Sequence, residues 1–196
     1  MDGCRAFDNS LGAAIELNIS CPNVKKGGME FGNDPEMSAQ VVESCRKVTA
    51  KPIITKLSPN QADIQLNAKL CIEAGTDALA VINTISGLAI DINKKELILG
   101  NRAGGLSGPA IKPIALKKDY DVYQVSKKHG VPIMGQGGIS SPEDAIEFVL
   151  AGASTVGVGT ALFFDPLICN KINQGLEAYL GNNGLKNVNE LVGGLV

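Results

Sequence analysis

The 196-residue sequence contains no tryptophan, and aromatic residues make up only 4% of it. A core must therefore be built from aliphatic side chains, and the chain is long enough for one domain with a substantial core. The longest apolar runs have the length of a β-strand, too short to span a bilayer. The N-terminal segment MDGCRAFDNS has no apolar signal region. We therefore expect a cytoplasmic protein without membrane contact.

Clusters of positive charge are also lacking. The formal net charge is −2, the isoelectric point is near 5.5, and no arginine-rich run occurs. Nucleic-acid binding depends on a basic patch or stripe, so nucleic acid is not an expected partner.

Histidine occurs once, as His129 before Gly130, at the expected end of a helix. A capping or solvent-exposed role fits this position, and nucleophiles activated by histidine are excluded. The five cysteines form no C-x-x-C pair, so neither a metal site nor an iron–sulfur cluster is expected. Cys45 and Cys71 have helical spacing among apolar neighbours and are expected to be buried. Cys21 differs, because it follows a polar strand face in a loop rich in glycine, proline and asparagine.

Glycine is abundant, with 23 residues, which suits repeated turns between strands and helices. Five segments are expected to be strands, and a segment with helical spacing follows each of them. This order with short connections predicts a parallel α/β sheet in one domain, residues 1–196. The strands are expected at about 14–19, 52–58, 77–84, 131–135 and 154–159, and the helices at about 35–49, 61–74, 110–128, from 141 onward, and 166–180.

A longer polar connection, residues 85–109, separates the third strand from the next helix. It contains the segment DINKKELILGN, for which we expect a small hairpin.

The first strand ends in the segment AIELNISCPNVKKGG, residues 14–28, which carries several polar side chains. Period-two alternation places Glu16 and Asn18 on the face opposite the apolar residues. Cys21 follows where the strand gives way to a loop, and ligands in α/β proteins bind at this end of the strands. We interpret Glu16 as a buried polar partner within the sheet.

Two glycine-rich strand ends, GQGGIS at 135–140 and VGVGTALF at 156–163, follow the last two strands. Such turns let backbone N–H groups approach an anion, and many TIM barrels build a phosphate site at this place. The alternative is that these glycines only form tight turns and bind no phosphate. Two such motifs after the last two strands favour the phosphate site. Lys56 ends the second strand and either reaches a ligand or extends its ammonium group to solvent. Asn83 and Thr84 end the third strand in the same way.

Six motifs in order, NISCPNVKKGG, KLSPN, INT…GLAIDI, GGLSGPAIKP, GQGGIS and VGVGTALF, resemble dihydroorotate dehydrogenase. The resemblance runs from about residue 12 to the C-terminus. It points to the class 1 cytosolic flavoproteins, especially the type that works with an electron-transfer subunit. It implies an FMN-dependent TIM barrel that oxidises dihydroorotate to orotate in de novo pyrimidine (UMP) synthesis.

The same resemblance implies roles for individual residues. Cys21 matches the loop cysteine that removes the C5 proton while the C6 hydride passes to FMN, and a thiol has a pKa suited to this step. Substrate contacts are implied for Asn18, Asn23, Asn83 and Thr84. Flavin contacts are implied for Asn18, Lys56 and Ile82, and contacts with the FMN chain and phosphate for Gly108, Gly137, Gly138, Gly159 and Thr160.

The resemblance also implies partners. The related enzymes pass electrons to NAD through a subunit with FAD and a 2Fe–2S cluster, and this chain has no motif for either group. We therefore expect such a partner subunit, and a homo-oligomer of the chain itself.

The barrel of this family has eight strands, and five are expected here, beginning at what would be the fourth. We therefore expect a partial TIM barrel of about five C-terminal strand–helix units, inactive as an isolated fragment. Two alternatives stay open: a related flavin barrel that acts on another dihydropyrimidine, and a truncated barrel remnant without catalytic activity.

Overall fold

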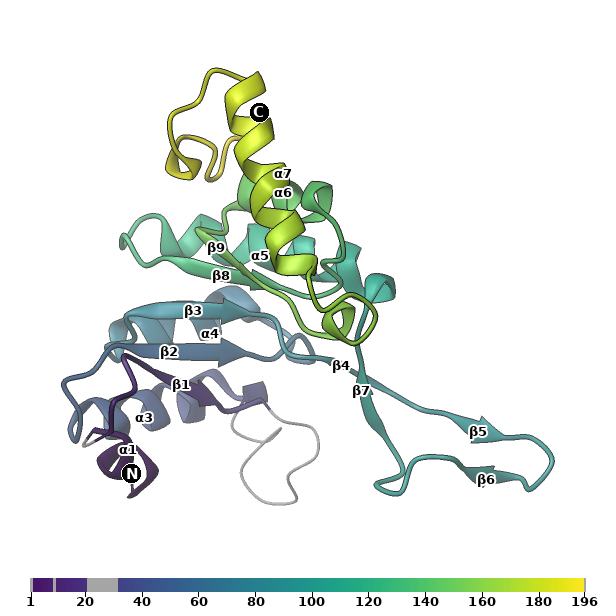
Figure 1. Cartoon of the computed structure of the whole chain (residues 1–196). Helices are drawn as coiled ribbons and strands as arrows, with labels where there is room; N and C mark the ends of the chain where they lie inside the picture. Colours follow the sequence, from purple (N-terminus) through teal and green to yellow (C-terminus); the bar gives the residue numbers. More distant parts are fainter. Residues whose placement is uncertain (1, 9, 21–31, 196) are drawn as a thin grey trace.

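The computed structural model describes residues 2–8, 10–20 and 32–195. Its main sheet has five parallel strands in the order β1-β2-β3-β8-β9, so strands that follow one another along the chain mostly lie side by side (Figure 1). This confirms the expected parallel sheet. The strands are β1 (Ile15–Asn18), β2 (Ile53–Leu57), β3 (Ala78–Val81), β8 (Ile133–Gln136) and β9 (Thr155–Gly157).

A helix follows each strand of this sheet, as the sequence predicts. The long helices are α3 (Pro35–Arg46), α4 (Ile64–Glu73), α5 (Lys112–Ser126), α6 (Pro142–Ala151) and α7 (Ile168–Asn182). Neighbouring helices of this series pack against one another, α3 with α4, α4 with α5, α5 with α6 and α6 with α7. The short helical elements of the described chain are α1 (Asp2–Asp8) and the 3-10 turns η1 (Pro109–Ile111), η2 (Thr160–Phe163) and η3 (Val188–Glu190).

Side-chain caps fix the starts of α3, α4 and α6. The Asp34 carboxylate accepts hydrogen bonds from the backbone N–H groups of Glu36 and Met37, which stabilises the first turn of α3. Ser141 Oγ accepts from the Asp144 N–H at the start of α6. The reciprocal bond of a capping box is not formed there, because the Asp144 carboxylate accepts hydrogen bonds from Ser140 instead of from the cap residue Ser141.

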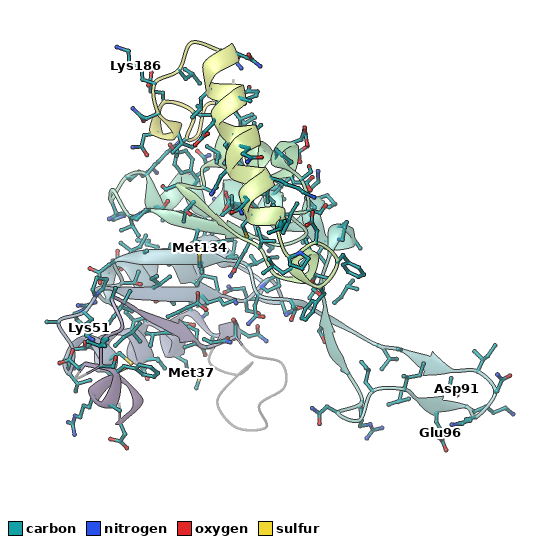
Figure 2. All side chains as sticks on the ribbon, in the orientation of Figure 1. Met37, Lys51, Asp91, Glu96, Met134 and Lys186 are labelled. Atoms are coloured by element: carbon teal, nitrogen blue, oxygen red, sulfur yellow. The ribbon has the colours of Figure 1, made fainter. Side chains whose placement is uncertain are left out.

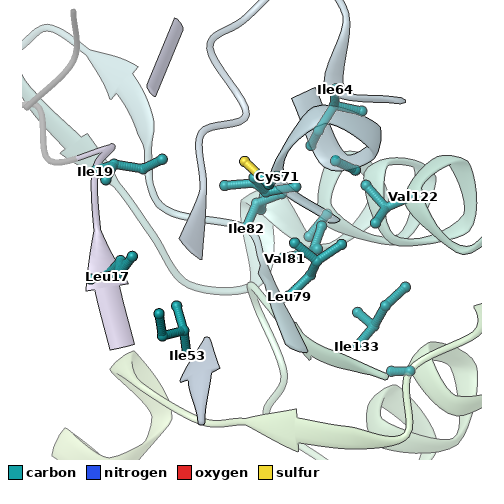
Figure 3. Packing of buried hydrophobic residues seen from close by; sticks show 14 of the residues in the cluster. Leu17, Ile19, Ile53, Ile64, Cys71, Leu79, Val81, Ile82, Val122 and Ile133 are labelled. Atoms are coloured by element: carbon teal, nitrogen blue, oxygen red, sulfur yellow. The ribbon is translucent and has the colours of Figure 1, made fainter. Parts of the chain in front are cut away.

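The core lies between the sheet and the helices. Alternate strand residues, such as Ile53, Leu79 and Ile133, are almost fully buried against helical residues that include Val122 and Cys71 (Figure 3). Cys45 is buried as well, so the prediction for both cysteines is confirmed. Burial raises the pKa of the Cys71 thiol to about 12, which keeps it protonated and makes it a poor nucleophile.

The opposite face of the sheet is less covered. Along β1 and β2 the alternate residues Glu16, Asn18, Ile54 and Lys56 are half-buried or exposed, and Met134 on β8 belongs to the same face (Figure 2). The expectation that Glu16 is buried is wrong, since its side chain is 37% exposed. It does have a polar partner, because its carboxylate lies 3.8 Å from the Lys56 ammonium group. This face is open along β1 and β2, which is why Glu16 remains accessible to solvent, whereas Ala80 on β3, the register partner of Lys56, is fully buried.

A narrow arm extends from the body between β3 and α5 (Figure 1). Its outer part is the expected small hairpin, β5 (Ile90–Asp91) paired with β6 (Glu96–Leu97), and Figure 2 shows Asp91 and Glu96 far from the sheet. Its inner part, β4 (Ile85–Gly87) paired with β7 (Gly104–Leu106), was not predicted, because three-residue strands rich in glycine carry little pattern. No helix in the part of the chain described here is long and apolar enough to cross a membrane.

Candidate functional site

The carboxyl ends of β2, β3, β8 and β9 surround a cavity of about 490 Å³. This size lies within the range of roughly 300–1,000 Å³ that is typical of small-molecule sites. The cavity brings together nine residues that the sequence marks as site candidates. They are Lys56, Ile82, Asn83, Thr84, Gly108, Gly137, Gly138, Gly159 and Thr160.

One end of the cavity carries amide and hydroxyl groups held in a network. Asn83 Nδ2 donates to Asn18 Oδ1 at 3.1 Å and to Ser20 Oγ at 2.8 Å, which joins the ends of β3 and β1. Asn83 Oδ1 accepts from the Thr84 N–H at 2.8 Å. The predicted residues Asn18, Asn83 and Thr84 therefore form one connected group, although Asn18 itself does not line the cavity.

Lys56 and Ile82 lie between this amide end and the glycine turns. The Lys56 side chain is 21% exposed and reaches Glu16, so its positive charge is only partly compensated at the cavity wall. Ile82 is 3% exposed, and its backbone N–H donates to the Gln136 carbonyl, which continues the pairing of β3 and β8. A cation beside an apolar wall suits a ligand that has both a flat apolar surface and a polar edge.

The other end of the cavity is made of glycine turns. Gly137 and Gly138 have positive φ angles of 134° and 80°. A Cβ atom on Gly138 would lie 2.8 Å from the Gly108 carbonyl oxygen, so only glycine lets these two turns approach so closely. Gly159 faces open space, and a Cβ atom there would meet nothing within 4 Å. Thr160 Oγ1 donates to Ser107 Oγ at 2.8 Å and links the turn after β9 to the turn before α5.

The residues conform to a model of the family described as dihydroorotate dehydrogenase over positions 1–180. This chain belongs to the dihydroorotate dehydrogenase family. The match covers the five strands and nearly all of α7, so it includes every residue that lines the cavity.

Curated relatives in this family carry the name dihydroorotate dehydrogenase B (NAD(+)), catalytic subunit. The protein from Pelobacter propionicus is 53% identical over 183 residues, and the one from Geotalea daltonii is 55% identical over 183 residues. Both matches cover 93% of this chain and 59% of the relative. The chain thus spans about three fifths of the length of these relatives.

A solved dihydroorotate dehydrogenase structure has the same fold. The enzyme of Eimeria tenella, crystallised with ferulenol, superposes with a TM-score of 0.81 at 22% sequence identity, over 98% of this chain and 56% of that one. The expected partial barrel of the dihydroorotate dehydrogenase fold is thereby confirmed.

Two residues with predicted roles in this family, Cys21 and Asn23, lie outside the described residues. Their roles stay predictions from the sequence. The motifs GGLSGPAIKP and GQGGIS, by contrast, supply the turns that meet at Gly108 and Gly138.

A charged cluster behind the glycine turns was not predicted. Lys112 Nζ lies 2.7 Å from Asp144 Oδ1 and 2.8 Å from Glu147 Oε2, and Asp144 Oδ2 accepts from both the N–H and the hydroxyl of Ser140. Burial alone would raise the pKa of Asp144, but the hydrogen bonds from Lys112 and Ser140 outweigh it and lower that pKa. The cluster joins the start of α5 to the start of α6 and braces the turn at 137–140.

Asn60 in the KLSPN motif has a comparable bracing role. Its Nδ2 donates to the Thr84 carbonyl at 3.1 Å and its Oδ1 accepts from the Ser86 N–H at 2.9 Å. The side chain thus fixes the segment that leads from Asn83 into the arm. Pattern alone could not assign this role, because the partners are distant in the sequence.

Replacing Gly138 with alanine is expected to destabilise the fold by about 2–3 kcal/mol, because a left-handed backbone and a clash with the Gly108 carbonyl act together. Gly130→Ala is the matched control, since Gly130 also has a positive φ, of 67°, but no atom within 4 Å of its Cβ position. It is expected to cost about 1 kcal/mol. Urea denaturation measures both. Equal losses of stability in the two variants would show that the close approach of the turns at Gly108 and Gly138 does not contribute to stability.

Proposed function

We propose that this chain forms the flavin-holding and catalytic part of a barrel that oxidises dihydroorotate to orotate. The observation that carries the proposal is the convergence of nine expected site residues on one cavity in a chain of this family. Amide groups gather at one end of that cavity and glycine turns at the other. This arrangement suits a substrate next to the ring of a long, phosphate-bearing cofactor.

The residues fit FMN as the cofactor. The open space at Gly159 and the close turns at Gly108 and Gly138 leave room for a phosphate beside the backbone, with the Thr160 hydroxyl within the same wall. We assign Lys56 and Ile82 to the ring and ribityl chain. When bound, the flavin supplies an acceptor for a hydride.

The amide group Asn18, Asn83 and Thr84, together with Asn23, is proposed to hold dihydroorotate. Cys21 is proposed as the base: its sulfur takes the C5 proton as the C6 hydrogen leaves with its electron pair, and the C5–C6 double bond of orotate forms. A thiolate is a suitable base, because the thiol pKa lies closer to neutrality than that of an alcohol.

Partners also belong to this proposal. The relatives from Pelobacter propionicus and Geotalea daltonii are named catalytic subunits of an NAD(+) enzyme. We propose that this chain likewise forms homo-oligomers and passes electrons to a subunit that carries FAD and a 2Fe–2S cluster.

The 196-residue chain alone is expected to bind FMN weakly and to oxidise little or no dihydroorotate. The reason is the uncovered face of the sheet, where Glu16, Ile54 and Lys56 remain accessible although a closed barrel would enclose them. The test compares flavin absorbance and dihydroorotate turnover of the purified chain with those of a barrel completed to the length of the relatives. Stoichiometric FMN with turnover in the 196-residue chain would contradict this expectation, and a completed barrel without turnover would contradict the proposed function.

A further inference from the structure

Gln136 stands out among the polar residues of the cavity. It is the last residue of β8, it lines the cavity, and its Nε2 atom is shielded from solvent without a hydrogen-bond partner among the described residues. The neighbouring polar side chains are occupied: Asn83 binds Asn18 and Ser20, and Thr160 binds Ser107. Buried amide groups in folded proteins nearly always have a partner, so this one requires an explanation.

The surroundings of Gln136 show that room is made for its side chain. Gly157 is its register partner on β9, and a Cβ atom there would lie 2.9 Å from Gln136 Oε1 and 3.3 Å from Gln136 Cβ. The glycine therefore lets the glutamine side chain lie over β9 at the cavity wall. On the other side, the Gln136 carbonyl accepts from the Ile82 N–H, which fixes the backbone between β3 and β9.

The terminal amide can serve an acceptor in the cavity. A half-turn about the last side-chain torsion exchanges Oε1 and Nε2, and this torsion is soft. The exchange places the two N–H donors on the side of Gly157, which lines the cavity. An amide nitrogen carries two donor hydrogens. Presenting the nitrogen to a ligand therefore satisfies more hydrogen-bonding capacity than presenting the oxygen would.

We propose that Gln136 is a binding residue for the flavin, donating a hydrogen bond from its amide to the ring or to the ribityl chain and not to the phosphate. This inference rests on the proposed function, because it takes the ligand of the cavity to be FMN. The position of Gln136 supports this choice of flavin atoms. Its carbonyl is hydrogen-bonded to the Ile82 N–H, and it directly precedes the glycine turn at Gly137 and Gly138.

Titration of the full chain with FMN and with riboflavin, which lacks the phosphate, tests the assignment. Gln136→Glu keeps the shape of the side chain but cannot donate when ionised, and Gln136→Met removes the polar group. Gln136→Met is expected to weaken the binding of FMN and of riboflavin by the same factor, about five- to tenfold, as one lost hydrogen bond does. Gln136→Glu is expected to weaken riboflavin binding to a similar degree and FMN binding more, because its charge also repels the phosphate. Thr160→Val, at the phosphate end of the cavity, is expected to weaken the binding of FMN and to leave the binding of riboflavin unchanged.

Unfolding of the flavin-free proteins provides a second measurement. Gln136→Met is expected to be at least as stable as the unmodified chain, because it removes an unpartnered donor, so weaker binding would not reflect loss of fold. Riboflavin affinity that neither Gln136 variant changes would contradict the assignment alone. An unmodified chain that binds neither flavin at millimolar concentration would contradict the proposed function, and this assignment with it.

Discussion

Replacing Asp119 with valine is expected to stabilise the protein by several kcal/mol at pH 8 and to remove the fall in stability that this group causes between about pH 4 and pH 8. Asp119 lies on α5, is 0% exposed, and neither carboxylate oxygen has a partner among the described residues. A Cβ atom on Gly135 would lie 3.1 Å from its Oδ1 atom, so the carboxyl group sits directly against β8. Burial raises its pKa from 3.8 to about 8.

The sign of the effect follows from proton binding. Between about pH 4 and pH 8 the folded state keeps the Asp119 proton, which the unfolded state has released. The contribution of Asp119 to stability is therefore greatest below about pH 4 and is lost as the pH rises toward 8, where the group ionises in the fold as well. From this group alone the loss is on the order of 5 kcal/mol, since one pKa unit corresponds to about 1.4 kcal/mol.

Urea denaturation across this pH range tests the prediction. Asp119→Asn is expected to flatten the profile as Asp119→Val does, with a smaller gain because its amide stays unpartnered. Asp121→Asn is the matched control: Asp121 lies two residues further along α5, is partly exposed and pairs with Lys117 at 2.6 Å, so its loss is expected to cost less than about 1 kcal/mol. A valine variant with the same pH profile as the unmodified protein would show that the Asp119 proton does not govern stability.

Replacing Cys21 with alanine in a barrel completed to the length of the relatives is expected to slow flavin reduction by dihydroorotate about 10²- to 10⁴-fold, the usual contribution of a positioned base. Cys21→Ser is expected to keep part of the rate and to need a higher pH, because an alcohol ionises less readily than a thiol. Stopped-flow loss of the oxidised-flavin absorbance measures the step.

Cys169 provides the control for this experiment. It is an exposed cysteine on α7, and Cys169→Ala is expected to leave the rate unchanged. Flavin reduction at the unmodified rate in the Cys21→Ala protein would reject the assignment of the base.

Much of the fold could be predicted because local signals and tertiary structure agree. Asp34 and Pro35 mark the start of α3, and alternating residues such as Ile53 and Leu57 mark the buried face of β2. The inner strands of the arm escaped prediction because their stability comes from pairing across the 16 residues that separate β4 from β7, residues 88–103, and not from local pattern.

The site shows the same division. The glycine turns and the strand-end polar residues were visible in the sequence, and the fold brings them to one cavity. The role of Gln136 was not visible in the sequence, because only the folded structure shows that its amide nitrogen has no partner. Asp119 was missed for a similar reason, since an aspartate in a helix usually faces water. Burial of Glu16 was wrongly expected because alternation gives the face of a side chain, not what covers that face.

Binding of FMN to the 196-residue chain, followed by flavin fluorescence, tests whether this cavity holds the flavin. Weak, saturable binding at one site is expected, reduced at least tenfold by Gly159→Glu, which adds an anion to the cavity wall at a position where a Cβ atom would meet nothing within 4 Å. Gly159→Ala, with a single added methyl group, is expected to have a much smaller effect. Saturable binding that Gly159→Glu leaves unchanged, or no binding at millimolar FMN, would contradict the claim that this cavity holds the flavin.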